Sequence, residues 1–89
     1  MKLTAIVLTR NESTHIADCI ATLRFADDIL VFDSFSDDAT VAVAQKAGVK
    51  IIQHPFENYA SQRNAALEAI RGQADWVLFV DADERVTPE

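Results

Sequence analysis

Residues 76–86 read WVLFVDADERV and are the clearest strand signal in this chain. The first five of these residues form a short, continuous apolar run, which is typical of a parallel strand covered on both faces. Two acidic residues, Asp81 and Asp83, follow directly where that strand should end. A buried strand that runs straight into carboxylates predicts a sheet whose carboxyl edge carries a polar site.

Three similar runs precede this one and are rich in β-branched residues, as parallel strands are. The segments between the runs repeat their apolar residues at helical spacing. Ser13 or Thr14 can cap the first helix. Asp37 and Asp38 can accept backbone hydrogen bonds at the start of the second helix, and Gly48 is placed to end it in a left-handed conformation. We expect strands at Leu3–Thr9, Ile29–Asp33, Val49–Gln53 and Trp76–Val80, and helices over Ile16–Leu23, Ala39–Ala47 and from near Asn58 to Gly72.

The alternation of strands and helices predicts an α/β protein. Right-handed crossovers favour a parallel sheet of order 3-2-1-4 with helices on both faces, a Rossmann-like three-layer sandwich. Apolar side chains expected inward are Cys19, Phe32, Ala60, Ala66, Leu67, Ile70, Trp76 and Phe79. Four other aromatic residues are expected in loops or at helix edges, where they could stack on a flat ligand: Phe25, Phe35, Phe56 and Tyr59.

The composition excludes several classes of protein. The 89 residues fit a single domain at most, and a net charge of −6 argues against binding to nucleic acid. A single cysteine cannot form an internal disulfide, which suits a reducing compartment. No run reaches the eighteen or so apolar residues of a membrane span. We therefore expect a cytoplasmic chain with no nucleic acid partner.

The ends of the first, second and fourth strands should meet at one edge of the sheet, where strand order reverses and ligands bind. Carboxylates gathered there repel one another unless a cation or hydrogen-bond donors are present. If the strand exit stays extended, Asp81 and Asp83 face the same way and suit Mg²⁺ or Mn²⁺, although they could simply end the strand and cap the next turn. Asp33 is expected to accept hydrogen bonds from a ligand.

Other polar residues have plainer expected roles. Asp37, Asp38 and Thr40 are predicted to cap the second helix. His15 and His54 lack metal-ligand spacing and are expected to be surface or capping groups. Neither a G-x-G-x-x-G nor a P-loop motif is present, so phosphate groups would be met by a metal ion.

Four motifs in order resemble those of the family 2 glycosyltransferases: LTRNE (8–12), VFDSFSDDAT (31–40), ASQRNAAL (60–67) and WVLFVDADERV (76–86). They are most similar to the branch that extends lipopolysaccharide core and other cell-surface glycans. The resemblance implies a GT-A fold that binds a nucleoside-diphosphate sugar, here a UDP-sugar, for transfer to an acceptor. The family pattern carries Gly and Thr where this chain has Phe35 and Asp37.

The resemblance also implies residue roles. Thr9, Asn11 and Glu12 would line the nucleoside pocket. Asp33 would bond the base, Arg63 would approach a base carbonyl, and Ser34 would also belong to the nucleotide-sugar site. Asp81 would touch the ribose or a metal-bound water, and Asp83 would coordinate the Mg²⁺ or Mn²⁺ ion that bridges the diphosphate.

Members of the family are longer, so residues 1–89 would form the truncated, nucleotide-sugar-binding N-terminal part. No catalytic residue is expected within this span, and the base would lie beyond Glu89. We expect this part to bind donor weakly and to transfer nothing alone. The full-length hexosyltransferase would act on a glycan or lipid-linked acceptor, in the cytoplasm at the inner face of the membrane, and the exposed edge of the fourth strand would favour self-association.

Two alternatives remain at this stage. A haloacid-dehalogenase-like phosphatase also carries Asp-x-Asp after a parallel strand, but Glu84 and Arg85 follow where Thr or Val is wanted, and the nucleophile strand normally comes first. A receiver-like interaction domain would cluster its acids after the first strand and place a Lys late, and this chain offers neither arrangement.

Overall fold

The strands and helices alternate along the whole of the computed structural model, which describes residues 2–55 and 57–81. The predicted order is confirmed, with small shifts at the ends of the elements. These elements are β1 (Leu3–Thr9), α1 (Ile16–Thr22), β2 (Asp28–Asp33), α2 (Thr40–Lys46), β3 (Lys50–Gln53), α3 (Tyr59–Ala69) and β4 (Trp76–Asp81).

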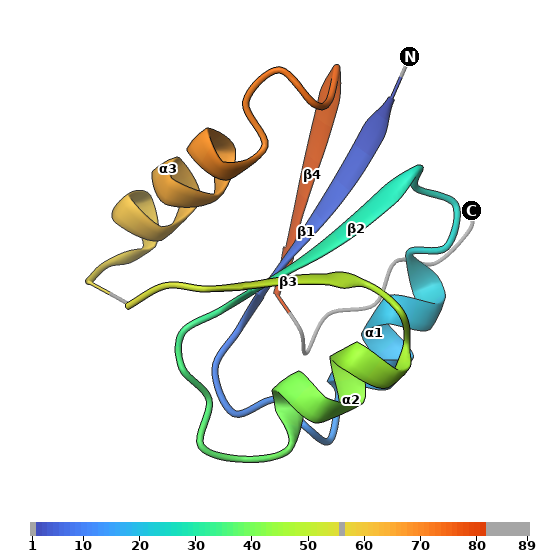
Figure 1. Cartoon of the computed structure of the whole chain (residues 1–89), viewed down its shortest axis with the longest axis vertical. Helices are drawn as coiled ribbons and strands as arrows, with labels where there is room; N and C mark the ends of the chain where they lie inside the picture. The colour runs from blue at the N-terminus through green and yellow to red at the C-terminus, as the bar shows by residue number, and fades with distance from the viewer. Residues whose placement is uncertain (1, 56, 82–89) are drawn as a thin grey trace.

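The strands form one parallel sheet of order β3-β2-β1-β4, as predicted (Figure 1). The register aligns Thr9 with Asp33 and Leu8 with Asp81. Because β1 pairs in parallel with both β2 and β4, the carboxyl ends of these three strands lie side by side, at the point where the strand order reverses. The sheet therefore positions three of the predicted polar segments at one edge.

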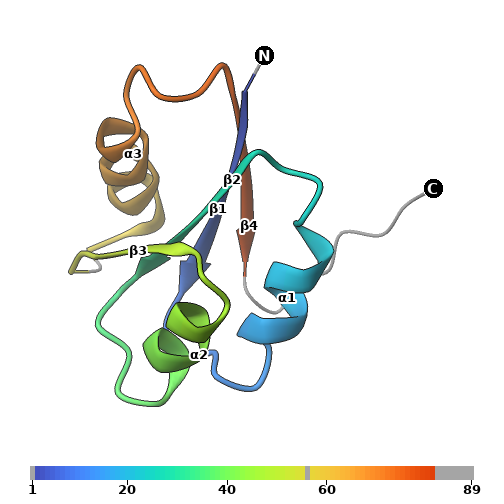
Figure 2. The same ribbon diagram turned by 45° about the vertical axis from the view of Figure 1, so that its right-hand side comes forward.

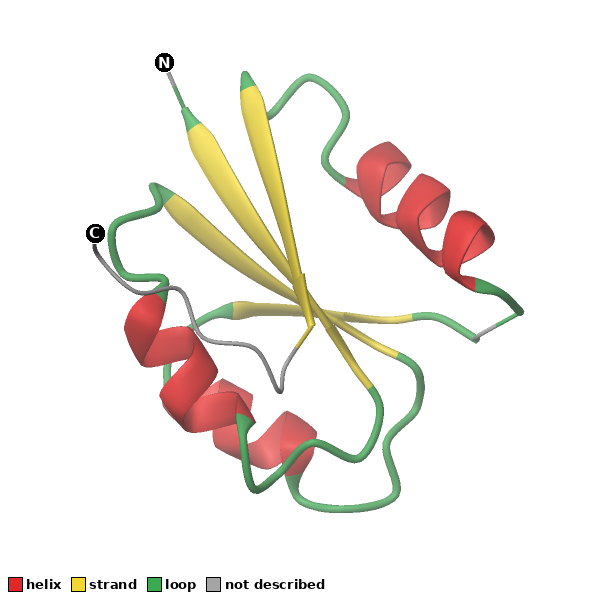
Figure 3. Ribbon diagram, turned by 180° about the vertical axis from the view of Figure 1, so that it is seen from behind, coloured by secondary structure: helices red, strands yellow, loops and turns green. Residues whose placement is uncertain are grey.

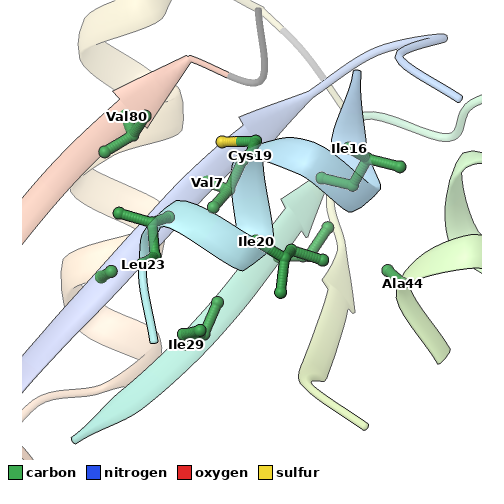
Figure 4. Packing of buried hydrophobic residues seen from close by; sticks show 10 residues of the cluster. Val7, Ile16, Cys19, Ile20, Leu23, Ile29, Ala44 and Val80 are labelled. Atoms are coloured by element: carbon green, nitrogen blue, oxygen red, sulfur yellow. The ribbon is translucent and has the colours of Figure 1, made fainter. Parts of the chain in front are cut away.

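Helices cover both faces of the sheet, which confirms the three-layer architecture (Figure 2). On one face α1 and α2 pack against the sheet, and Cys19 is fully buried there, as expected of a core residue (Figure 4). On the other face Ala66 and Ile70 of α3 pack against Ile6, Leu30 and Phe32. Both faces of β1 and β2 are thus apolar, which explains their continuous hydrophobic runs.

Three expected core positions are wrong. Ala60 and Leu67 are exposed, because the inward stripe of α3 runs through Gln62, Ala66 and Ile70 at a spacing of four residues. Trp76 is 59% exposed. It is the first residue of β4 and pairs in register with Leu3 at the start of β1, so it lies at the end of the sheet.

Some of the helix ends expected from the sequence are present in the structure and others are not. The third helix begins next to Asn58, as predicted, and Asn58 caps it by accepting a hydrogen bond from the Ser61 amide. Ser13 and Thr14 do not cap α1, whose N-cap residue is His15 without a side-chain bond, so that expectation is wrong. Gly48 ends α2 with a φ of 77°, which is the left-handed conformation expected there.

No helix within residues 2–55 and 57–81 is long and apolar enough to cross a membrane.

Candidate functional site

The loops that follow β1 and β2 run side by side beyond the carboxyl edge of the sheet (Figures 1 and 3). Hydrogen bonds between backbone amides and side chains join them. We call residues 10–15 and residues 34–40, which include the first residue of α2, the joined loops. The bonds run from the Asn11 amide to Ser36 Oγ (2.8 Å), from the Asp37 amide to Asn11 Oδ1 (2.7 Å), from the Glu12 amide to Thr40 Oγ1 (2.8 Å) and from the Ser13 amide to Asp38 Oδ2 (3.2 Å).

Asp38 fixes the start of α2 as well as the β1 loop. Its Oδ1 accepts hydrogen bonds from both the amide and the hydroxyl of Thr40. These bonds, led by the one from the Thr40 hydroxyl, lower the pKa of Asp38 to about 2. The predicted capping role is confirmed for Asp38. Asp37 is exposed instead, with its carboxylate 4.0 Å from the Arg10 guanidinium.

Asp33 lies at the tip of β2 with its side chain directed into the protein. The residue is 0% exposed. Its carboxylate accepts hydrogen bonds from the Thr9 hydroxyl (2.6 Å), from the Ser36 amide (2.8 Å) and hydroxyl, and from Gln53 Nε2 (3.3 Å). Burial raises the pKa of Asp33, but the bonds from Ser36, Thr9 and Gln53 outweigh it and the pKa is lowered overall. The buried group is therefore a carboxylate that anchors the loop after β2.

Gln62 also lies at the candidate site, although it was not among the residues predicted for it. It is 2% exposed and reaches from α3 to the ends of two strands. Its Nε2 donates to Ser34 Oγ over 2.8 Å, and its Oε1 lies 3.2 Å from His54 Nδ1. The His54 ring also stacks on Phe32, with centroids 5.6 Å apart, so this half-buried histidine has packing contacts beyond those expected of a surface or capping group. The signal was the spacing of four residues from Gln62 to Ala66 on the inward stripe.

Arg63 and Asp81 lie near the end of β4 rather than near β2. The Arg63 guanidinium lies over the Phe79 ring, 5.6 Å from its centroid, in a cation–π arrangement. Side chains two residues apart in a strand point to the same face, so Asp81 follows Phe79 on the α3 face. Asp81 is exposed at the sheet edge, while Asp83, the second predicted ligand, lies outside the described residues.

Phe35, in the loop after β2, has a backbone conformation that is unusual for a phenylalanine. It has a φ of 51°, and its side chain is 50% exposed. Asn11 in the other loop has a φ of 53°, which an asparagine adopts more readily. Each of the two loops beyond the carboxyl edge thus contains one residue with a left-handed backbone conformation.

The opposite edge of the sheet also carries carboxylates, but these have structural partners. Asp75 and Asp27 accept hydrogen bonds from the amides of Lys2 and Leu3, at 2.8 and 2.7 Å. The Lys2 ammonium lies 2.7 Å from Asp28, and this hydrogen bond lowers the pKa of Asp28. These groups hold the strand starts together.

Within the described part of the chain, no three His, Cys, Asp or Glu side chains gather so as to hold a metal ion. The oxygen donors at the carboxyl edge are of the kind that Mg²⁺ and Mn²⁺ prefer, with Asp81 as the exposed carboxylate of β4.

The fold and its polar edge define an open parallel α/β domain of the kind that binds ligands at the carboxyl ends of its strands. The chain belongs to glycosyl transferase family 2, whose family model matches residues 4–89. This assignment selects the transferase interpretation over the phosphatase and receiver alternatives.

Curated relatives agree with the assignment. An uncharacterized glycosyltransferase of Rickettsia conorii is 39% identical over 89 residues, which cover 99% of this chain and 31% of the relative. The lipopolysaccharide core biosynthesis glycosyltransferase LpsC of Rhizobium meliloti is 33% identical, over 97% of this chain and 33% of its own length. The chain therefore spans about a third of the length of these relatives.

Solved structures share the fold. Mannosyl-3-phosphoglycerate synthase from Rubrobacter xylanophilus superposes with a TM-score of 0.83 at 23% identity, over 99% of this chain and 32% of that one. Glucosyl-3-phosphoglycerate synthase from Mycobacterium tuberculosis, in complex with Mn²⁺, UDP and glucosyl-3-phosphoglycerate, gives a TM-score of 0.80 at 20% identity, over 94% and 35%. The GT-A fold expected from the sequence is thereby confirmed.

Proposed function

We propose that residues 1–89 form the donor-binding part of a glycosyltransferase and bind a nucleoside-diphosphate sugar, a UDP-sugar, at the joined loops. The observation that carries the proposal is the convergence of the β1, β2 and β4 ends at one edge, with the two loops fixed by four cross-loop hydrogen bonds. A rigid polar edge of this kind can bind a ligand without first ordering itself.

The residues divide into two groups in this proposal. Thr9, Asp33 and Ser34 are buried and hold the loop after β2 in shape, while the half-buried Glu12 and the exposed Asn11 border the nucleoside. Because the Asp33 carboxylate accepts its hydrogen bonds from neighbouring residues, its influence on the base is exerted mainly through the loop. Arg63 contributes positive charge near the end of β4, where the diphosphate would lie.

A divalent ion, Mg²⁺ or Mn²⁺, fits the chemistry of Asp81, with Asp83 as the second ligand. When bound, the ion would offset the charge that develops on the leaving diphosphate. Beside such an ion, Asp81 would supply an oxygen ligand, and Arg63 would add a second positive group on the same face of β4. The structure of the Mycobacterium tuberculosis enzyme in complex with Mn²⁺ and UDP supports this choice of ion and nucleotide.

We extend the proposal to the whole protein. The name of LpsC supports a role in lipopolysaccharide or other cell-surface glycan synthesis, with a glycan or lipid-linked acceptor at the inner face of the membrane. Since the chain covers about a third of its relatives, we propose that the catalytic base and acceptor site come from residues beyond Glu89. Residues 1–89 alone are then expected to bind donor and transfer no sugar.

Calorimetric titration of UDP and GDP into the chain, with and without MnCl₂, tests donor binding. We expect Mn²⁺-dependent UDP binding that Asp83→Ala and Asp81→Asn abolish. Glu68→Gln is the matched control, since Glu68 is an exposed carboxylate near the end of α3 and pairs only loosely with Arg71, at 3.5 Å. Failure of a folded wild-type chain to bind either nucleotide with Mn²⁺ would overturn the proposal.

A further inference from the structure

The backbone at Phe35 is in a conformation that bulky residues rarely adopt. Its φ of 51° lies in the left-handed region, where a large side chain is a genuine outlier. Both neighbours are hydrogen-bonded: the Ser34 amide donates to the Thr9 carbonyl (2.9 Å), and the Ser36 amide donates to the Asp33 carboxylate (2.8 Å). The surrounding contacts therefore impose the strained conformation on Phe35.

The hydrophobic core does not explain the phenylalanine. The side chain is 50% exposed and belongs to neither buried cluster of the described residues. A glycine would adopt the same φ without strain. Residues held in such conformations concentrate at ligand sites, where surrounding structure offsets the cost. The exposed ring is thus better explained by a contact made outside the folded chain.

The position of Phe35 in the sheet suggests which part of a donor it contacts. Strand β1 lies between β4 and β2, so the ends of β4 and β2 are two strand spacings apart, roughly 10 Å. A diphosphate bound at Asp81 would leave the nucleoside to extend along this edge towards β2. The part of the ligand that reaches the loop after β2 is then the base, whose flat face suits an aromatic ring.

We propose that the Phe35 ring forms a stacking face for the nucleobase of the donor. This inference rests on the proposed function. It adds to the site a residue that contributes to donor affinity only through its contact with the base. It predicts that Phe35 raises affinity for nucleoside diphosphates and leaves affinity for inorganic pyrophosphate unchanged.

The test is titration of UDP, GDP and inorganic pyrophosphate, each with MnCl₂, into the wild-type chain and three variants. Phe35→Leu keeps an apolar side chain on the same backbone but removes the ring, and Phe35→Trp keeps an aromatic face. Phe25→Leu is the matched control, because Phe25 is 59% exposed and precedes β2, at the opposite edge of the sheet. Thermal unfolding of each variant confirms that it is folded.

We expect Phe35→Leu to weaken UDP binding at least about fivefold and to leave pyrophosphate binding unchanged. Phe35→Trp and Phe25→Leu should bind UDP as the wild type does. Equal UDP affinity of Phe35→Leu and wild type would overturn the stacking role while leaving the proposed function intact, and so would a parallel loss of UDP and pyrophosphate. Absence of UDP binding by the wild type would overturn both.

Discussion

Thr9 and Asp33 occupy the last paired positions of two neighbouring strands, and the Thr9 hydroxyl donates a 2.6 Å hydrogen bond to the Asp33 carboxylate. Both residues are buried, so the bond lies out of reach of water. It joins the end of β1 to the end of β2 at the point from which the joined loops depart.

Thr9→Val replaces the hydroxyl with a methyl group of similar size and leaves the Asp33 carboxylate short of one donor. We expect the free energy of unfolding to fall by about 2 kcal/mol, because bonds to buried charged groups are worth more than neutral ones. Urea denaturation measures the change, with Thr14→Val at an exposed position as the control. Equal losses in the two variants would contradict a role for the Thr9 bond.

Gln62→Leu removes the side chain that links α3 to Ser34 and His54. The leucine fits the apolar stripe but leaves buried polar partners without their bond, so we expect a loss of about 1–2 kcal/mol. Gln45→Leu, at an exposed position of α2, should change stability little. Unfolding curves that coincide with the wild type for Gln62→Leu would show that the link is dispensable.

The stability of the fold should fall in acid. The pKa of Asp38 is lowered from 3.8 to about 2 by its bonds to Thr40, and that of Asp33 is also lowered. Groups with a lowered folded-state pKa stabilise the fold above their unfolded pKa and lose that contribution as the pH falls. The melting temperature should therefore decline between about pH 4 and pH 2. Asp38→Asn should decline less steeply, and a slope equal to that of the wild type would contradict this assignment.

Gly48→Ala tests the left-handed end of α2. A methyl group at Gly48 would meet no heavy atom within 4 Å, so the cost arises from the φ of 77° alone. We expect a loss of about 1 kcal/mol, and a smaller loss for Gly48→Asn because asparagine tolerates this conformation. Thermal unfolding of both variants decides the point, and identical melting temperatures for alanine and asparagine would argue against backbone strain.

The strands and their order were predictable because each depends on short-range patterns and one rule of handedness. Continuous apolar runs mark strands covered on both faces, and right-handed crossovers then limit the arrangement of β1 to β4. The exposure of Trp76 was not predictable in this way. Its surroundings depend on where the register places it, at the start of β4.

The polar edge of the sheet was predictable in location more than in detail. The sequence indicates which strand ends carry polar residues, and hence that Thr9, Asp33 and Asp81 share an edge. It does not indicate that the Asp33 carboxylate would be enclosed by donors from β1, β3 and its own loop, because those partners are brought together only by the folded register. The role of Gln62 was not predicted for a similar reason. Its hydrogen bonds join α3 to Ser34, just after β2, and to His54, just after β3.

The bonds between the joined loops couple their local opening. The amides of Asn11, Glu12 and Ser13 are held by side chains of the second loop, and the Asp37 amide is held by the first. Neither loop can expose its amides to solvent without releasing the other, so these four amides should exchange with deuterium as one cooperative unit. We therefore expect a perturbation at one of the two strand ends to alter amide exchange at the other, through these four hydrogen bonds.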